Sequence, residues 1–328
     1  MQTPKNTYDV IIIGGGPIGI ACALEAEKKD LSYLILEKGC LVNSLYHYPT
    51  NMTFFSTSEK LELNDIPFIS NNPKPRKAEA LEYYRRIATS NKININLFEK
   101  VTKVESQDDL HIVTSIKNQY TAKNIVVATG FYDIPNYLNI PGEDLPKVAH
   151  YYGDPHYYAT LKTIVVGASN SAVDAALEIY RKGGEVTMIV RKAEIGRRVK
   201  YWVRPDIENR IKESSIKAFF NANLKEIREN EVIIETPEGE KVLENDFVLM
   251  LTGYRPNFEF LQNMGIDLSE DGKKIPQYNE ETMETNVKGI YLAGVICGGV
   301  ETHKWFIENS RVHAEMIMNH LANKKEAV

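Results

Sequence analysis

Apolar and polar residues follow one pattern in two separate segments of the chain, Tyr8–Lys38 and Leu161–Lys192. Each segment has a short apolar run, a turn of small residues, an amphipathic stretch and a second apolar run. In the first segment, the run Val10–Ile13 is long enough for a buried parallel strand and too short for a helix. The pattern then predicts a helix over Ile20–Lys29 and a strand over Tyr33–Leu36. This order of elements is typical of a nucleotide-binding unit, so we expect two bound nucleotides.

The remaining sequence predicts further strands and helices around a loop-rich stretch at Leu41–Asn72. The second segment predicts a strand at Ile164–Val166 and a helix that ends near Ile179. Further helices are expected at Lys77–Asn91, Arg204–Ser214 and from about Thr302 to Ala322. Further strands are expected at Asn94–Leu97, Val101–Glu105, Leu110–Ser115, Ile125–Ala128, Lys217–Phe220, Glu226–Arg228, Val232–Glu235 and Phe247–Leu251. The last strand, Gly289–Gly294, fits best beside those of the first segment, so the second segment lies within an insertion.

The turn of the first segment has the glycine spacing of a dinucleotide-binding unit. Gly14 makes the tight turn, Gly16 lets a pyrophosphate approach the helix N-terminus, and Gly19 lets helix and strand pack closely. Glu37 stands at the end of the next strand, where a carboxylate accepts hydrogen bonds from two ribose hydroxyls. The first nucleotide therefore has an unphosphorylated ribose. The alternative is a structural glycine turn with a surface glutamate.

The second segment ends in basic residues, where the first ends in the acidic Glu37. Only Gly167 of its turn is glycine, and small residues follow it, but the next strand ends in Arg191 and Lys192, with Arg197 and Arg198 close behind. Guanidinium groups bind a ribose phosphate bidentately, whereas a carboxylate would repel it. This segment is therefore expected to prefer NADPH to NADH. The alternative is a solvated basic edge, which charge runs usually are.

Length, charge and cysteine content argue against nucleic-acid-binding, membrane and metal-binding proteins. The chain has 328 residues, 43% of them hydrophobic, which is enough for two α/β domains, and its net charge of −5 does not suggest a nucleic-acid surface. No apolar run reaches the length of a membrane span, and the polar start resembles no targeting segment. Cys22, Cys40 and Cys297 have no paired or metal-ligand spacing. We expect a cytoplasmic protein without metal, nucleic-acid or membrane partners.

Five motifs make the chain resemble the low-molecular-weight thioredoxin reductase superfamily. They are GGGPIG with Glu37, VVATG at Val126–Gly130, the second segment with Arg191, LTGYRPN at Leu251–Asn257 and GIYLAG at Gly289–Gly294. The resemblance implies an α/β fold with two Rossmann-like (three-layer ββα) dinucleotide-binding domains. Residues 1–155 and 285–328 would form the FAD domain, and residues 156–284 would form an NADPH domain inserted into it.

The superfamily pattern also implies the cofactor-binding residues. FAD would be bound by Gly14, Gly16, Pro17, Ile18, Gly19, Glu37, Lys38, Tyr48, Thr53, Val101, Thr129, Gly130, Gly294 and Val295. NADPH would be bound by Gly167, Ser169, Asn170, Ser171, Arg191, Lys192, Arg197, Arg198 and Gly253. Superfamily members usually carry an aspartate at the position of Val295. Thioredoxin reductases also carry a redox CxxC, which this chain lacks, so an internal dithiol is excluded.

Longer stretches are similar to the bacillithiol disulfide reductase (YpdA-type) family. They are NMTFFSTSEKLELNDIPFI, KPRKAEALEYYRRIA, GASNSAVDAALE and VKYWVRPDIENRI. The similarity implies an NADPH-dependent flavoprotein that reduces the disulfide of a low-molecular-weight thiol. Many members have a cysteine in the first turn, proposed to form a mixed disulfide beside the flavin, where this chain has Ile18. We assign no catalytic residue, and favour packing roles for Cys22 and Cys297.

The sequence leaves other functions open. The same fold serves ferredoxin or flavodoxin–NADP reductases, which also lack a CxxC, and flavin monooxygenases. A redox sensor that binds both nucleotides is the non-enzymatic alternative. Within the reductase hypothesis, the N-terminus of the helix expected from Thr302 would stabilise reduced flavin. The sequence allows a homo-oligomer but does not specify one.

Overall fold

The computed structural model describes residues 7–326, which form two compact units. The first unit runs up to His47, over Met52–Ile134 and from Tyr254 onward, and the second comprises Tyr48–Asn51 and Pro135–Gly253. Apart from the short segment Tyr48–Asn51, the chain passes between the units at 134/135 and 253/254, whereas we expected domain limits at 155/156 and 284/285. The difference has local causes. Strand β8 (Val148–Ala149) joins the sheet of the second unit, and helix α6 (Phe258–Asn263) packs against β4 (Val101–Gln107) in the first.

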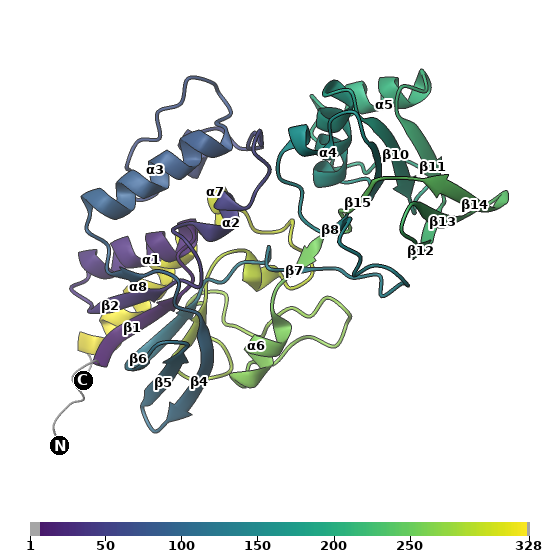
Figure 1. Cartoon of the computed structure of the whole chain (residues 1–328). Helices are drawn as coiled ribbons and strands as arrows, with labels where there is room; N and C mark the ends of the chain where they lie inside the picture. The colour runs from purple at the N-terminus through teal and green to yellow at the C-terminus, as the bar shows by residue number, and fades with distance from the viewer. Residues whose placement is uncertain (1–6, 327–328) are drawn as a thin grey trace. The chain divides into compact units, whose positions relative to one another are not determined.

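The first unit is built on a seven-stranded sheet with the order β3-β2-β1-β6-β5-β4 and β17 paired to β6 (Figure 1). Its other strands are β1 (Thr7–Ile13), β2 (Tyr33–Leu36), β3 (Ile95–Asn96), β5 (Leu110–Ser115), β6 (Gln119–Val127) and β17 (Ile290–Leu292). Strand β6 is parallel to β1 on one side; on its other side, its first half is antiparallel to β5 and its end is parallel to β17. The pairing of β17 with β6 confirms that the final strand returns to the first unit's sheet.

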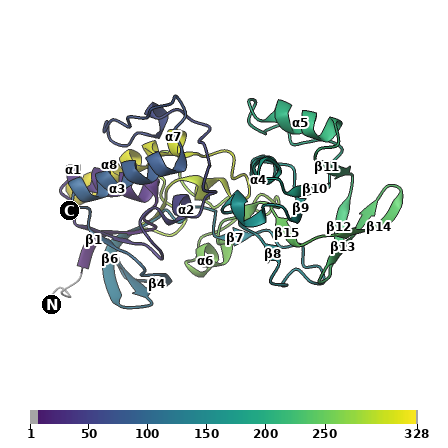
Figure 2. The same cartoon turned by 45° about the horizontal axis from the view of Figure 1, so that its top comes forward.

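Helices α1 (Pro17–Lys28) and α8 (Val312–Glu326) pack against each other in the first unit, and Figures 1 and 2 show both beside the parallel strands. Helix α3 (Lys77–Ser90) buries the face that carries Tyr83, Tyr84 and Ile87. The expected helix start at Thr302 is wrong. Helix α7 begins at Ile307, because the Asn309 side chain accepts a hydrogen bond from the Phe306 backbone amide, and α8 follows at Val312. The N-terminus that was expected to stabilise reduced flavin is therefore absent at Thr302.

The second unit has the three-layer arrangement. Its five-stranded parallel sheet has the order β11-β10-β9-β15-β8, and a three-stranded antiparallel sheet has the order β12-β13-β14. The strands are β9 (Lys162–Val166), β10 (Glu185–Val190), β11 (Lys217–Phe220), β12 (Asn223–Ile227), β13 (Glu231–Thr236), β14 (Gly239–Glu244) and β15 (Phe247–Met250). The helices are α4 (Asn170–Arg181) and α5 (Arg204–Lys212). This architecture confirms the predicted α/β class.

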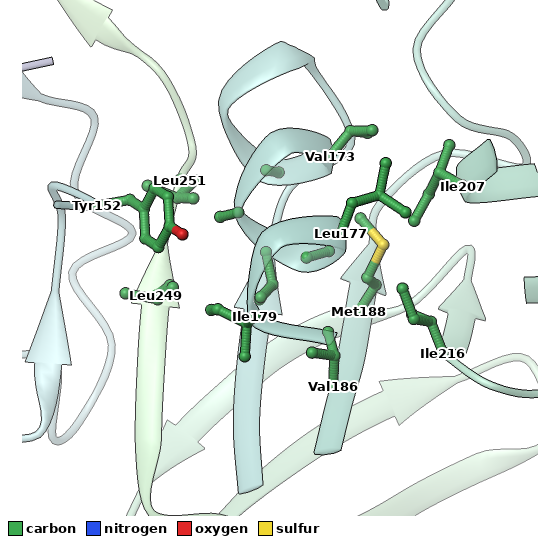
Figure 3. Close-up of a cluster of buried hydrophobic side chains, with 14 of the residues drawn as sticks. Tyr152, Val173, Leu177, Ile179, Val186, Met188, Ile207, Ile216, Leu249 and Leu251 are labelled. Atoms are coloured by element: carbon green, nitrogen blue, oxygen red, sulfur yellow. The ribbon is translucent and has the colours of Figure 1, made fainter. Parts of the chain in front are cut away.

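Successive side chains of the parallel strands point to opposite faces of the sheet, and this alternation explains the three layers of the second unit. In β9, Val165 joins the core under α4, while Ile164 and Val166 join the core under the antiparallel sheet. Figure 3 shows the helix side, where Leu177 of α4 lies beside Met188 of β10 and Ile207 of α5. Both faces of the sheet are thus buried, which is why these strands read as continuous apolar runs. Within residues 7–326, no helix has the length and apolarity to cross a membrane.

The core under the antiparallel sheet yields a stability prediction. Ile234 of β13 is fully buried in it, whereas Val242 on neighbouring β14 is 54% exposed. We expect Ile234→Ala to lower the free energy of unfolding by about 2–5 kcal/mol, because it leaves a cavity. Val242→Ala, the matched control, should change it by less than about 0.5 kcal/mol. Urea unfolding measures both, and equal effects would contradict this layer assignment.

Candidate nucleotide sites

Close backbone contacts define the glycine turn between β1 and α1. Gly14 has φ of 112°, and a Cβ there would lie 2.5 Å from the carbonyl oxygen of Ala128. A Cβ at Gly19 would lie 1.9 Å from the carbonyl oxygen of Gly14. At Gly16, by contrast, an added Cβ would meet no described atom within 4 Å. Two glycines are therefore required by packing, while the third keeps space open at the start of α1.

Glu37 follows β2 and is only 5% exposed. Its Oε2 accepts a hydrogen bond from the Gly15 amide at 2.6 Å, and its Oε1 accepts one from the Gly39 amide at 2.8 Å. Burial raises the pKa of Glu37, and the two amides oppose that shift because they stabilise the charged form. Each carboxylate oxygen has a second lone pair, so Glu37 can also accept hydrogen bonds from ribose hydroxyls.

The surroundings of the turn fit a dinucleotide with a pyrophosphate. Gly16 precedes α1, and no side chain caps the helix, so its first amides can donate to an anion. Among the described residues, the buried Thr129 Oγ1 has no hydrogen-bond partner. Gly130, with φ of 74°, leaves its Cβ side open. An orphaned hydroxyl beside open space is what a bound polar group would satisfy.

The other residues predicted to bind FAD are spread over several elements. Pro17 is the first residue of α1, and Lys38 forms an ion pair with Asp133 at 2.6 Å. Thr53 forms an isolated bridge with Arg76, and the buried Val101 starts β4. Tyr48 falls in the second unit rather than with these residues. Their roles toward FAD remain predictions.

The turn before η3 (Val295–Gly298) faces Ile18. Gly294 has φ of 89°, and its Cβ would lie 3.3 Å from Ile18 Cγ1. The Gly294 amide donates to Nδ1 of the buried His313 at 3.1 Å. Burial lowers the pKa of His313 to about 4, so the ring is neutral at pH 7. His313, which no sequence motif singles out, thus accepts this hydrogen bond from the turn as a neutral ring.

The cysteines of this unit are poor nucleophiles. Cys22 of α1 and Cys297 of η3 are both fully buried. Burial raises the pKa of Cys22 to about 12 and also raises that of Cys297. Cys40 is partly exposed, and burial raises the pKa of its thiol as well. Since the thiolate is the reactive form, this chemistry supports packing roles for Cys22 and Cys297.

The second turn repeats the close packing of the first. Gly167 has φ of 126°, and its Cβ would lie 2.5 Å from the carbonyl oxygen of Leu251. Ser169 precedes α4 without capping it through its side chain, and Ser171 lies in the first turn of that helix. Gly253, with φ of 95°, accepts a backbone hydrogen bond from Asn136 at 3.0 Å. Small residues thus open the N-terminus of α4 for a pyrophosphate.

The predicted phosphate ligands lie after β10 and are all exposed: Arg191, Lys192, Arg197 and Arg198. Arg197 pairs with Glu194 at 2.9 Å, and both side chains are largely exposed. In the described part of the chain, no carboxylate pairs with Arg191 or Arg198. The Asn170 side chain contacts this loop, since its Nδ2 donates to the Arg198 carbonyl oxygen. The structure thus gathers these cations along one loop.

Residues 11–294 match the model of the pyridine nucleotide-disulphide oxidoreductase family. The chain is 43% identical to bacilliredoxin reductase Bdr of Bacillus subtilis (strain 168) over 317 residues, 96% of this chain and 98% of that protein. It superposes on the bacillithiol disulfide reductase Bdr (YpdA) of Staphylococcus aureus with a TM-score of 0.95 and 39% identity, covering 98% and 99% of the two chains. It superposes on the Bdr (YpdA) structure of Bacillus cereus with a TM-score of 0.95 and 42% identity, covering 97% of this chain and 99% of that chain.

A pair of glycine substitutions tests the first turn. Gly19→Ala should lower the free energy of unfolding by more than about 4 kcal/mol, because its methyl group overlaps a carbonyl oxygen. Gly16→Ala should change it by less than about 0.5 kcal/mol, since its φ of −75° suits alanine. Gly16→Ala should instead lower FAD occupancy by filling the open space. Urea unfolding and the flavin-to-protein absorbance ratio measure these effects, and normal FAD affinity in Gly16→Ala would refute the assignment.

The neutral state of His313 predicts a pH dependence. Its pKa falls from 6.5 to about 4 on folding, so between these values the unfolded chain binds more protons than the folded one. Stability should be full above pH 6.5 and fall toward pH 4, by about 3 kcal/mol from this group. His313→Asn retains an acceptor for the Gly294 amide without the titration, so it should flatten this slope. Unfolding by urea across this pH range measures both proteins, and identical slopes would contradict the prediction.

Proposed function

Because the chain belongs to the bacillithiol disulfide reductase (Bdr) family of pyridine nucleotide-disulphide oxidoreductases, we propose that it uses NADPH and FAD to reduce bacillithiol disulfide. The reaction takes two electrons and one proton from NADPH and a second proton from water. It breaks the sulfur–sulfur bond and releases NADP⁺ and two bacillithiol thiols. Identity of 43% across nearly the whole chain is the observation that carries this proposal.

Support for FAD comes from the first unit. Glu37 would accept from the adenosine ribose, the open N-terminus of α1 would receive the pyrophosphate, and the Thr129 hydroxyl would gain a partner. FAD supplies the capacity to take a hydride and pass its electrons to a disulfide. The apolar side chain of Ile18 lies against the backbone of Gly294, and the two would keep water from the bound cofactor.

Support for NADPH comes from the second unit. The cations after β10 stand where a ribose phosphate is read in this fold, and Arg191 follows the strand directly. A carboxylate at that position would favour NADH, as Glu37 favours an unphosphorylated ribose in the first unit. We therefore propose the 2′-phosphate as the group that Arg191 binds.

The proposal includes a route without a cysteine of this chain. The chain has no CxxC, Ile18 occupies the position where many family members have a cysteine, and Cys22 and Cys297 are buried with raised pKa values. The three free cysteines suit a reducing compartment, so we propose a cytoplasmic location.

Rapid mixing of the flavoprotein with NADPH tests the proposed activity. We expect bleaching of the flavin absorbance, followed by steady NADPH consumption when bacillithiol disulfide is added. Arg191→Ala should raise KM for NADPH about tenfold, because a charge-assisted contact is lost, and should leave KM for NADH unchanged. Cys22→Ser and Cys297→Ser should retain activity.

The same assay is repeated with ferredoxin and with a bacilliredoxin in place of bacillithiol disulfide. A bacilliredoxin is included because the Bacillus subtilis relative is named a bacilliredoxin reductase. Flavin that stays oxidised with NADPH would rule out every reductase function. Consumption with ferredoxin alone would favour the ferredoxin–NADP reductase alternative. Loss of turnover in Cys297→Ser with normal flavin bleaching would refute the cysteine-free route.

A further inference from the structure

The loop Ala193–Lys200 is fixed to the second unit on both sides of its two arginines. Ile195 and Val199 are buried in the core under α4, with 3% and 6% of their surfaces exposed. The Gly196 amide donates to the Ala168 carbonyl oxygen at 2.9 Å, and a Cβ at Gly196 would lie 2.8 Å from that oxygen. Between these anchors, Arg197 and Arg198 are exposed.

Two side chains of α4 hold the end of this loop. Asn170 donates from Nδ2 to the Arg198 carbonyl oxygen at 3.1 Å and accepts at Oδ1 from the Lys200 amide at 2.9 Å. Asp174, one turn further along α4, pairs through Oδ2 with Lys200 Nζ at 2.7 Å. The side chains of Lys200 and Asp174 are only 10% and 20% exposed.

Two ion pairs on this loop, the partly buried Asp174–Lys200 pair and the exposed Arg197–Glu194 pair, differ in their contribution to stability. Removing one partner of a buried ion pair leaves an uncompensated charge and is strongly destabilising. The pair between Arg197 and Glu194, with side chains 86% and 54% exposed, is screened by water and contributes little. The Asp174–Lys200 pair is therefore the ionic contact that fixes the loop, and it leaves the arginines available.

We propose that Asp174 is a positioning residue for nucleotide selection. Together with Asn170 and Lys200, it holds Arg197 and Arg198 in place before the nucleotide arrives, so that binding the 2′-phosphate costs little ordering of the loop. Asp174 acts through Lys200 and the backbone of the loop, not through contact with the phosphate. This inference rests on the proposed use of NADPH.

The test compares Asp174→Ala with Arg191→Ala and the wild-type holoenzyme. Asp174→Ala should raise KM for NADPH about tenfold and leave KM for NADH within about twofold. The reason is that the loop contacts only the 2′-phosphate, which NADH lacks. Calorimetry with adenosine 2′,5′-bisphosphate should show the same loss without turnover. Asp174→Glu, which retains the charge, should restore most of the affinity. Glu244→Ala breaks an exposed pair with Lys162 in the same unit and should change neither KM.

The outcomes separate this inference from the proposed function. A wild-type enzyme without preference for NADPH would refute the proposed cofactor use, and this inference with it. If Arg191→Ala loses the preference but Asp174→Ala keeps it, the proposed function stands and the role of Asp174 is wrong. If Asp174→Ala fails to fold, Asp174→Asn retains an acceptor oxygen without the charge and should show a smaller, NADPH-selective loss. An equal rise in both KM values would mean that Asp174 only stabilises the unit.

Discussion

The structure of each unit depends on a backbone contact that allows no side chain. Gly19 approaches the carbonyl oxygen of Gly14, and Gly167 approaches that of Leu251, so in both units a turn of the chain lies directly against another strand or helix. This closeness sets where α1 and α4 begin relative to the ends of β1 and β9. The helix N-termini that we propose for the two pyrophosphates follow these turns directly. A methyl group at either contact would overlap a carbonyl oxygen and force the backbone there to shift.

We propose that the two units use the same scaffold to recognise different nucleotides. In the first, the strand after the helix ends in a buried carboxylate, and in the second it ends in exposed cations. The two recognition sites also differ in how firmly their charged residues are held. Glu37 is held by the backbone amides of Gly15 and Gly39, whereas the loop that carries Arg197 and Arg198 is held by side chains of α4. Anion recognition by long side chains needs such supports, because free arginines lose more conformational entropy on binding.

Much of this could be predicted from the sequence, because strand periodicity and glycine spacing are local signals. The strands at Val10–Ile13 and Ile164–Val166 and the α/β class were predicted for that reason. Features that depend on distant contacts were not: the start of α7, fixed by Asn309, and the domain limits, set by β8 and α6. The pairing of Asp174 with Lys200 was also missed, since a helical aspartate and a loop lysine carry no spacing signal.

The hydrogen bonds of Glu37 bear on how the flavoprotein is assembled. Both oxygens of this buried carboxylate already have amide partners within the polypeptide, so neither oxygen lacks a hydrogen bond when no cofactor is bound. This arrangement favours folding of the first unit before the cofactor binds, with cofactor loading as a later and separate step. Such a chain would tolerate reversible removal of its flavin, unlike proteins whose ligand is part of their folding nucleus.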